Sequence, residues 1–268
     1  MRVIGFDGIE ISAAKMRDVL AAGFDEIELA SWLAHIDIPG IGFLLDIERQ
    51  GVDQEALKKE ASDIFRLAKI AGTKGVQVLT GPVQVGAVAS FAAGQTSGFY
   101  EGVLRLPREE QFSVTARNLA WLADLAAEQD LLLYLESLAW SPLNRLSDQV
   151  ELIDRAGRPN VRMVVDYWHC YASGDRPEDV ARLDGKLIYG VHICDSLDFK
   201  AGIPNEIVLR DVPTGKGVLN LRDWTAAVKA TGYEGWWSCE LFCRRQQQAN
   251  SFEVARELHS LMHSLVLG

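Results

Sequence analysis

Leu131-Leu-Leu-Tyr-Leu-Glu136 and Val161-Arg-Met-Val-Val-Asp166 are the stretches that decide the fold, and Ile188-Tyr-Gly-Val-His192 and Trp236-Trp-Ser-Cys-Glu240 repeat their pattern. Each is a short, mostly apolar run that ends in a carboxylate or an imidazole. Continuous apolar runs of this length are typical of parallel strands covered on both faces. The four stretches therefore predict buried parallel strands with a polar group at each carboxyl end.

Further apolar runs alternate with amphipathic segments along the chain. The expected strands are Arg2–Phe6, Glu26–Ala30, Ile41–Asp46, Gly75–Leu79, Leu131–Glu136, Val161–Asp166, Ile188–Ile193 and Trp237–Leu241. Between them, three sets of apolar residues each share a helical face: Leu57, Ala61, Ile64, Phe65 and Ala68; Leu119, Leu122, Leu125 and Ala126; Phe252, Ala255, Leu258, Leu261, Met262 and Leu265. Eight such units predict an α/β protein, a single-domain (β/α)8 TIM barrel over residues 1–268. An open doubly wound sheet would need a glycine-rich turn after the first strand, and none is found.

The composition restricts the function. The 268 residues carry a net charge of −10, and no cluster of basic residues is longer than a pair such as Arg244–Arg245, which argues against a nucleic-acid partner. No apolar stretch approaches the ~20 residues of a membrane span, and the segment Met1–Asp7 does not resemble a signal peptide. The four cysteines form no CxxC pair, so we expect free buried thiols and a cytoplasmic setting.

One stretch, Thr80 to Pro107, contains five glycines and no clear periodicity. It follows an expected strand, so in a barrel it would lie over the face where active sites form. Long irregular loops are commonly functional. We expect a lid or a wall of the substrate pocket here, with a plain insertion as the alternative.

Glu136, Asp166, His192 and Glu240 each end one of the four apolar runs. A carboxylate at such a place is costly unless it is paired or coordinated. In a barrel the strand ends converge on one face, so these side chains would meet. A shell of three carboxylates and one imidazole suits a divalent ion, with Mn²⁺ expected and Mg²⁺, Co²⁺ or Zn²⁺ as alternatives. For any single residue, capping of the next helix is an equally good explanation.

The sequence resembles the xylose-isomerase-like TIM-barrel superfamily of sugar isomerases and epimerases, and within it the inosose isomerase-like proteins. The resemblance rests on Tyr134-Leu-Glu136, Val165-Asp-Tyr-Trp-His169, Val191-His-Ile-Cys-Asp195, Arg210-Asp-Val-Pro-Thr-Gly-Lys-Gly217 and Cys239-Glu-Leu-Phe242, and on the run from His192 to Phe199. It weakens toward the N-terminus.

The resemblance implies a role for individual residues. Glu136, Asp166, His192 and Glu240 match the metal ligands of the family, while His169 and Arg210 match its substrate-binding residues. In the epimerases the first and last glutamates, here Glu136 and Glu240, also form the acid/base pair. Such chemistry removes a proton beside a carbonyl, and a bound metal stabilises the resulting enediolate. The expected substrate is a ketose, a keto-inositol or a related carbohydrate or cyclitol.

Three other functions remain open at this stage. A lyase of the same fold, either a dehydratase or a 3-oxo-glycoside-cleaving enzyme, would use the same metal and base. A DNA-repair endonuclease would need more metal ligands and a basic face, which five histidines and a charge of −10 do not favour. A sugar-binding or assembly subunit would not need an intact ligand set. No interface for a homo-oligomer is recognisable.

Several neighbouring residues have competing explanations. Asp195 either orients His192 or caps a helix. Trp140, Trp168 and Phe242 either stack on a sugar or pack in the core, and packing is the commoner role near strand ends. Lys216 lies in a Gly-Lys-Gly turn that lacks the P-loop pattern. His35, His259 and His263 show no ligand spacing, and the cysteines are expected to fill the core.

Overall fold

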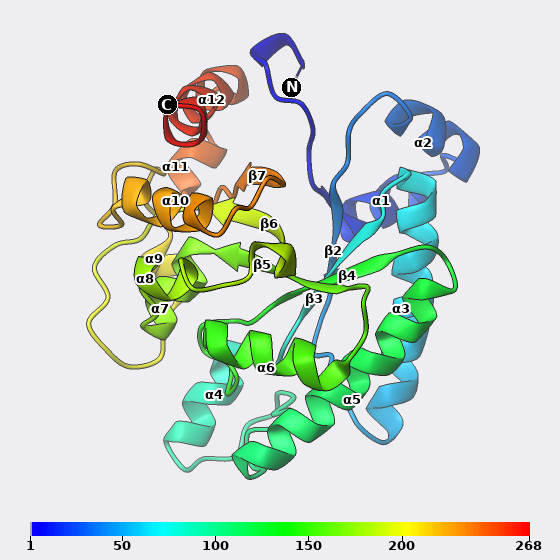
Figure 1. The fold of residues 1–268 in the computed structure, drawn as a ribbon. Helices are drawn as coiled ribbons and strands as arrows, with labels where there is room; N and C mark the ends of the chain where they lie inside the picture. Colours follow the sequence, from blue (N-terminus) through cyan, green and yellow to red (C-terminus); the bar gives the residue numbers. More distant parts are fainter. Residues whose placement is uncertain (1) are drawn as a thin grey trace.

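The computed structural model describes residues 2–268, so Met1 lies outside the described residues. Seven parallel strands form one sheet in chain order (Figure 1). They are β1 Ile11–Ser12, β2 Gly40–Leu44, β3 Gly75–Leu79, β4 Leu132–Glu136, β5 Val161–Asp166, β6 Ile188–Ile193 and β7 Trp236–Cys239. The sheet curls on itself, and within residues 2–268 its edge strands β1 and β7 do not pair with each other.

Helices follow the strands and cover the outside of the sheet (Figure 1). The longer ones are α1 Ala13–Ala21, α2 Glu26–Leu33, α3 Val52–Ala71, α4 Val85–Ala92, α5 Arg108–Ala127, α6 Leu146–Ala156, α7 Tyr167–Ser173, α10 Leu221–Ala230 and α12 Ser251–Val266. Shorter turns are η1 Arg2–Ile4, α8 Pro177–Val180, η2 Gly185–Leu187, α9 Glu206–Leu209 and α11 Arg244–Gln247. Among the described residues, no helix is both long and apolar enough to cross a bilayer.

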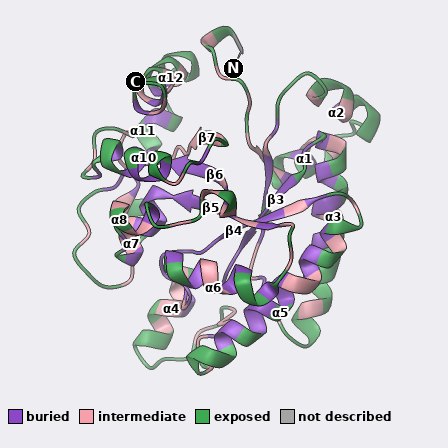
Figure 2. Ribbon diagram, in the orientation of Figure 1, coloured by how far each residue is buried: buried purple, intermediate pink, exposed green. Residues whose placement is uncertain are grey.

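The core lies between the sheet and these helices, where Figure 2 shows the inward helix faces and strands β2 to β6 as mostly buried, whereas β1 and β7 are half-buried. Every residue of the expected face on α3 is buried, from Leu57 to Ala68, as are Leu119, Leu122 and Ala126 on α5. On α12 the buried stripe is Val254, Leu258, Met262 and Leu265, whereas Phe252 is 59% exposed. The helical periodicity therefore predicted the packing faces of α3 and α5 correctly. On α12 it placed the start of the buried stripe at Phe252, whereas the stripe begins at Val254.

Two expected strands were wrong. Glu26–Ala30 lies in helix α2, because Asp25 caps its N-terminus and Glu28 returns the bond in a capping box. Arg2–Phe6 begins with the turn η1, and Gly5 has a φ of +106°, which breaks an extended run. The first strand is instead the two-residue β1, so the sheet has seven strands where eight were expected.

The segment 80–107 is less irregular than expected, because it contains helix α4. Its start is fixed by two buried or half-buried acids of the loop after β2. Glu48 Oε2 accepts a hydrogen bond from Gly81 N at 2.8 Å, and Asp46 Oδ1 accepts one from Val83 N at 2.8 Å. Trp140 Nε1 donates to the Pro82 carbonyl at 3.0 Å. These contacts tie the segment to the carboxyl ends of β2 and β4.

Candidate metal centre

The carboxyl ends of β4 to β7 bring the four predicted ligands together. Parallel register pairs Asp166 directly with His192, and His192 with Ser238, two residues before Glu240. His192 Nδ1 lies 3.5 Å from Glu136 Oε1, 3.8 Å from Asp166 Oδ2 and 3.7 Å from Glu240 Oε1. The imidazole nitrogen is therefore surrounded by three carboxylates from three other strand ends.

Within residues 2–268, two buried atoms of this cluster have no hydrogen-bond partner: Glu136 Oε1 and His192 Nδ1. Buried polar atoms are rarely left unsatisfied, and each one calls for an explanation such as an ion. Candidate ligand atoms of Asp166, His192 and Glu240 lie within 4.8 Å of one another, and so do those of Glu136, Asp166 and His169. The donor set and its unsatisfied atoms fit a divalent cation.

Burial sets the protonation of Glu136. Its pKa is raised to about 7, first because the carboxyl is removed from water and then because Glu240 and Asp166 are near, although His192 opposes the rise. Gln77 of β3 donates from Nε2 to Glu136 Oε2 at 2.8 Å, which leaves Oε1 as the oxygen that faces His192. Glu136 is thus oriented by a neutral donor and titrates near neutral pH.

Asp166 has two functions at once. Its Oδ1 accepts a hydrogen bond from the backbone N–H of His169 at 2.7 Å and so caps α7. This is the helix-capping role considered for each strand-end residue. Its Oδ2 faces His192 Nδ1 at 3.8 Å and the Arg210 guanidinium at 3.6 Å. Burial alone would raise the pKa of Asp166, but Arg210, His169 and His192 outweigh it and lower the pKa. The carboxylate stays ionised and faces the cluster.

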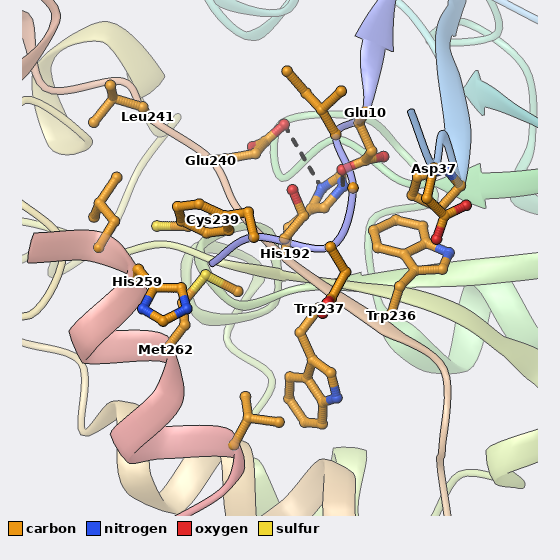
Figure 3. Close-up of a pocket in the computed structure, with 18 of the residues that line it drawn as sticks. Glu10, Asp37, His192, Trp236, Trp237, Cys239, Glu240, Leu241, His259 and Met262 are labelled. Carbon is orange, nitrogen blue, oxygen red and sulfur yellow. Dashed lines mark hydrogen bonds and ion pairs between the residues drawn. The ribbon is translucent and has the colours of Figure 1, made fainter. Parts of the chain in front are cut away.

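His192 is oriented from behind by Glu10, a residue that the sequence did not single out. Glu10 Oε2 lies 3.0 Å from His192 Nε2, and Tyr134 Oη donates to Glu10 Oε1 at 3.0 Å. A carboxylate can only accept, so Nε2 carries a proton, and Nδ1 is the nitrogen that faces the cluster and would bind an ion once it has lost any proton of its own. Figure 3 shows Glu10 and Glu240 on either side of the His192 ring.

Arg210 links the cluster to a second group of polar residues. It is buried, with its guanidinium 3.9 Å from the ring centroid of Phe242. One arm bonds Glu240 Oε2 at 2.6 Å and the other bonds Glu206 Oε1 at 2.9 Å. Phe242 therefore packs against the arginine, and Trp168, which is fully buried, packs in the core.

His169 lies beside the cluster as a neutral imidazole. Its Nδ1 accepts the backbone N–H of Ala139 at 3.0 Å, so the proton sits on Nε2. Burial lowers its pKa to about 4. Nε2 lies 3.7 Å from Glu206 Oε1, which brings His169 and Arg210, the two predicted substrate-binding residues, to the same acid.

Asp195 performs neither of the roles considered for it. Its carboxylate accepts four backbone N–H groups, from Ser196, Gly215, Gly217 and Leu219. It therefore organises the Gly-Lys-Gly turn and leaves His192 to Glu10. The four cysteines are free thiols; Cys170, Cys194 and Cys243 are buried and Cys239 is half-buried, in agreement with the expected core role.

A cavity of about 980 Å³ reaches the cluster from one side. Glu10, Gln77, His192 and Glu240 line its inner end. Its outer end lies between the N-terminal segment and α12, where Figure 3 shows His259 and Met262. The open seam between β1 and β7 thus gives a small molecule a route to two of the candidate ligands.

The fold and the site together define an α/β barrel whose strand ends carry a carboxylate-rich centre able to hold a divalent ion. The chain belongs to the xylose isomerase-like TIM barrel family, whose model matches residues 1–264. Both the predicted family and the predicted fold class are confirmed.

Individual relatives add detail. An inosose isomerase of Bacillus velezensis is 30% identical over 141 residues, 52% of this chain and 49% of that protein. A 3-dehydroshikimate dehydratase of Pseudomonas aeruginosa is 30% identical over 132 residues, 48% of this chain and 21% of that protein. The chain thus matches about half the length, or less, of these curated relatives. The crystal structure of the IolI protein with a bound zinc atom superposes with a TM-score of 0.82 and 22% identity, covering 98% of this chain and 88% of that one.

Proposed function

We propose that this protein is a divalent-metal-dependent isomerase or epimerase of a ketose or keto-inositol. The observation that carries the proposal is the pair of buried unsatisfied atoms, Glu136 Oε1 and His192 Nδ1, facing each other at 3.5 Å among the carboxylates of Asp166 and Glu240. The similarity to inosose isomerases supports a cyclic or open-chain polyhydroxy ketone as the substrate. Mn²⁺ is the proposed ion because oxygen ligands predominate, although the zinc in the related IolI structure makes Zn²⁺ the first alternative.

The four side chains Glu136, Asp166, His192 and Glu240 would hold the ion. When bound, it would polarise the substrate carbonyl and so acidify the neighbouring C–H bond. Asp166 and His192 act as ligands only, since Asp166 also caps α7 and His192 is fixed by Glu10.

Glu136 and Glu240 are the proposed acid/base pair. Glu136, with a pKa raised to about 7 by burial, is close to the value that suits a base working at neutral pH. It takes the proton from the carbon beside the carbonyl on one face of the substrate. Glu240, whose Oε2 is fixed by Arg210 at 2.6 Å, returns a proton on the other face. In the reverse direction the two residues exchange roles.

A lyase is the second candidate, and the similarity to a dehydratase favours it. The first step is shared, because a dehydratase also removes a proton next to a ketone. The two reactions then diverge: an isomerase returns the proton to carbon or oxygen, while a lyase expels a β-substituent.

A substrate screen separates the candidates. Metal-free protein is loaded with Mn²⁺ and incubated with inososes, ketoses, 3-oxo-glycosides and 3-dehydroshikimate. With the incubation in deuterated water, an isomerised product that contains deuterium supports the isomerase or epimerase. An unsaturated product supports the lyase. Glu136→Gln and Glu240→Gln are each expected to lower turnover at least 100-fold, while Glu109→Gln, an exposed control (73% side-chain exposure), leaves it unchanged. Full activity in both variants would reject the proposed pair.

A further inference from the structure

Glu206 is a half-buried acid that is not among the four predicted metal ligands. It is the first residue of the four-residue helix α9, in the long connection between β6 and α10. Its neighbours Ile207 and Val208 are 70% and 55% exposed, whereas the Glu206 side chain retains 20% exposure. The helix therefore presents apolar residues to solvent and turns its acid toward the site.

The two contacts of Glu206 are the two predicted substrate-binding residues. Its Oε1 accepts a hydrogen bond from an arm of Arg210 at 2.9 Å and lies 3.7 Å from His169 Nε2. The 3.7 Å separation is too long for a hydrogen bond. The second oxygen, Oε2, makes no hydrogen bond to any residue in 2–268. Glu206 thus has unused acceptor capacity next to a donor that is also unused.

That donor is His169 Nε2–H, because Nδ1 is occupied by the backbone N–H of Ala139. A single substrate hydroxyl lying off the line between the two side chains can accept from His169 and donate to Glu206 at the same time. A carbonyl or an ether oxygen can accept from His169 but has no proton for Glu206. The pair is therefore selective for a free hydroxyl group.

We propose that Glu206 is a specificity-determining residue that, with His169, recognises one free hydroxyl of a polyhydroxy ketone. The inference rests on the proposed function, since it assigns a substrate contact to the same site. It also explains why Arg210 bonds two acids: Glu240 belongs to the chemistry and Glu206 to recognition, and the guanidinium sets their spacing. A substrate with that hydroxyl removed or substituted loses the Glu206 contact.

The test measures binding and turnover of an inosose and its monodeoxy analogues by the Mn²⁺-loaded wild type, Glu206→Ala and Glu206→Gln. Glu206→Ala is expected to raise the KM for the inosose about 10-fold, the usual effect of losing one hydrogen bond. Glu206→Gln, which keeps one acceptor oxygen, should fall between. Asp198→Asn, an exposed acid of the same connection with 55% exposure, is the matched control and should match wild type.

The deoxy series separates recognition from a structural role. At one deoxy position only, the KM of Glu206→Ala divided by the KM of wild type should fall to nearly one. At that position the hydroxyl that Glu206 binds is already missing. An equal advantage for every analogue, or an unchanged KM for the inosose, would overturn the inference. So would a parallel loss of Mn²⁺ affinity in titration calorimetry, since Glu206 would then act through Arg210.

Failure of the proposed function gives a different result. If wild type turns over no polyhydroxy ketone but binds inosose in a Glu206-dependent way, the reaction is wrong and the recognition role stands. If wild type binds no member of the series, both are rejected.

Discussion

Replacing Glu10 by glutamine or alanine tests whether the orientation of His192 depends on the residue behind it. Glu10 Oε2 lies 3.0 Å from His192 Nε2, and Tyr134 holds the other oxygen at 3.0 Å. Burial alone would raise the pKa of Glu10, but the facing His192 outweighs it and lowers the pKa, so the carboxylate is ionised at neutral pH. A carboxylate behind a metal-binding histidine fixes the tautomer and increases the basicity of the ligating nitrogen.

The two substitutions remove different parts of this support. Glu10→Gln keeps a carbonyl oxygen for the Nε2–H of His192 but removes the charge, so we expect Mn²⁺ affinity to fall about 10-fold, or about 1.4 kcal/mol. Glu10→Ala removes both the charge and the acceptor, so nothing fixes the imidazole ring and its tautomer, and losing such a supporting partner lowers metal affinity by up to about 100-fold. The expected loss for alanine is therefore about 100-fold.

Titration calorimetry of metal-free protein with Mn²⁺ at pH 7.5 measures both losses directly. Asp18→Asn serves as the control, because Asp18 is 73% exposed and lies in helix α1, which begins three residues after Glu10. The reasoning fails if both Glu10 variants bind Mn²⁺ within twofold of wild type. It also fails if glutamine is as damaging as alanine, since the carbonyl acceptor would then contribute nothing.

Three further predictions concern stability. The pKa of Glu48 is raised from 4.5 to about 7 by burial and by Asp46, so the folded state is penalised as the pH rises above about 4.5, and the penalty is complete above pH 7. Glu48→Gln should remove about 2.5 kcal/mol of the fall in unfolding free energy between pH 5 and pH 8, measured by urea melts of metal-free protein, and an unchanged fall would contradict this. Asp195→Ala removes the acceptor of four backbone N–H groups, so we expect about 2–4 kcal/mol of destabilisation in the same melts, whereas a loss under 1 kcal/mol would show that water replaces the carboxylate. Mn²⁺ at about 100 times its Kd should stabilise wild type by about 2.7 kcal/mol and raise its Tm. EDTA should reverse the increase in Tm, and His192→Ala should not show it. An equal increase in Tm for His192→Ala would mean that the ion binds elsewhere.

The second half of the chain was predictable because each strand carries its own signal. From β4 to β7 a mostly apolar run ends in a carboxylate or an imidazole, and parallel pairing brings neighbouring strand ends into register, as it does for Asp166 and His192. The prediction that four such ends meet needed only the barrel topology. The helix faces of α3 and α5 followed from periodicity for the same local reason.

The first half failed where local signals compete. Glu26–Ala30 alternates polar and apolar residues like a strand, but the capping box of Asp25 and Glu28 starts a helix there. The true first strand, Ile11–Ser12, has two residues, too few for any pattern to show. Sequence patterns also missed the supporting acids: Glu10 meets a histidine 182 positions away, and Glu206 lies in an irregular connection. An i, i+4 spacing from Arg210 was the one available hint for Glu206.

The most direct test of the metal centre is the stoichiometry of Mn²⁺ binding. Metal-free protein is titrated with Mn²⁺, and electron paramagnetic resonance measures how much of the ion is bound. The arrangement of Glu136, Asp166 and Glu240 around His192 Nδ1 predicts one Mn²⁺ per chain in wild type. His192→Ala should abolish that binding while the fold persists by circular dichroism. No Mn²⁺ binding by wild type, or undiminished binding by His192→Ala, would contradict the assignment of this cluster as the metal site.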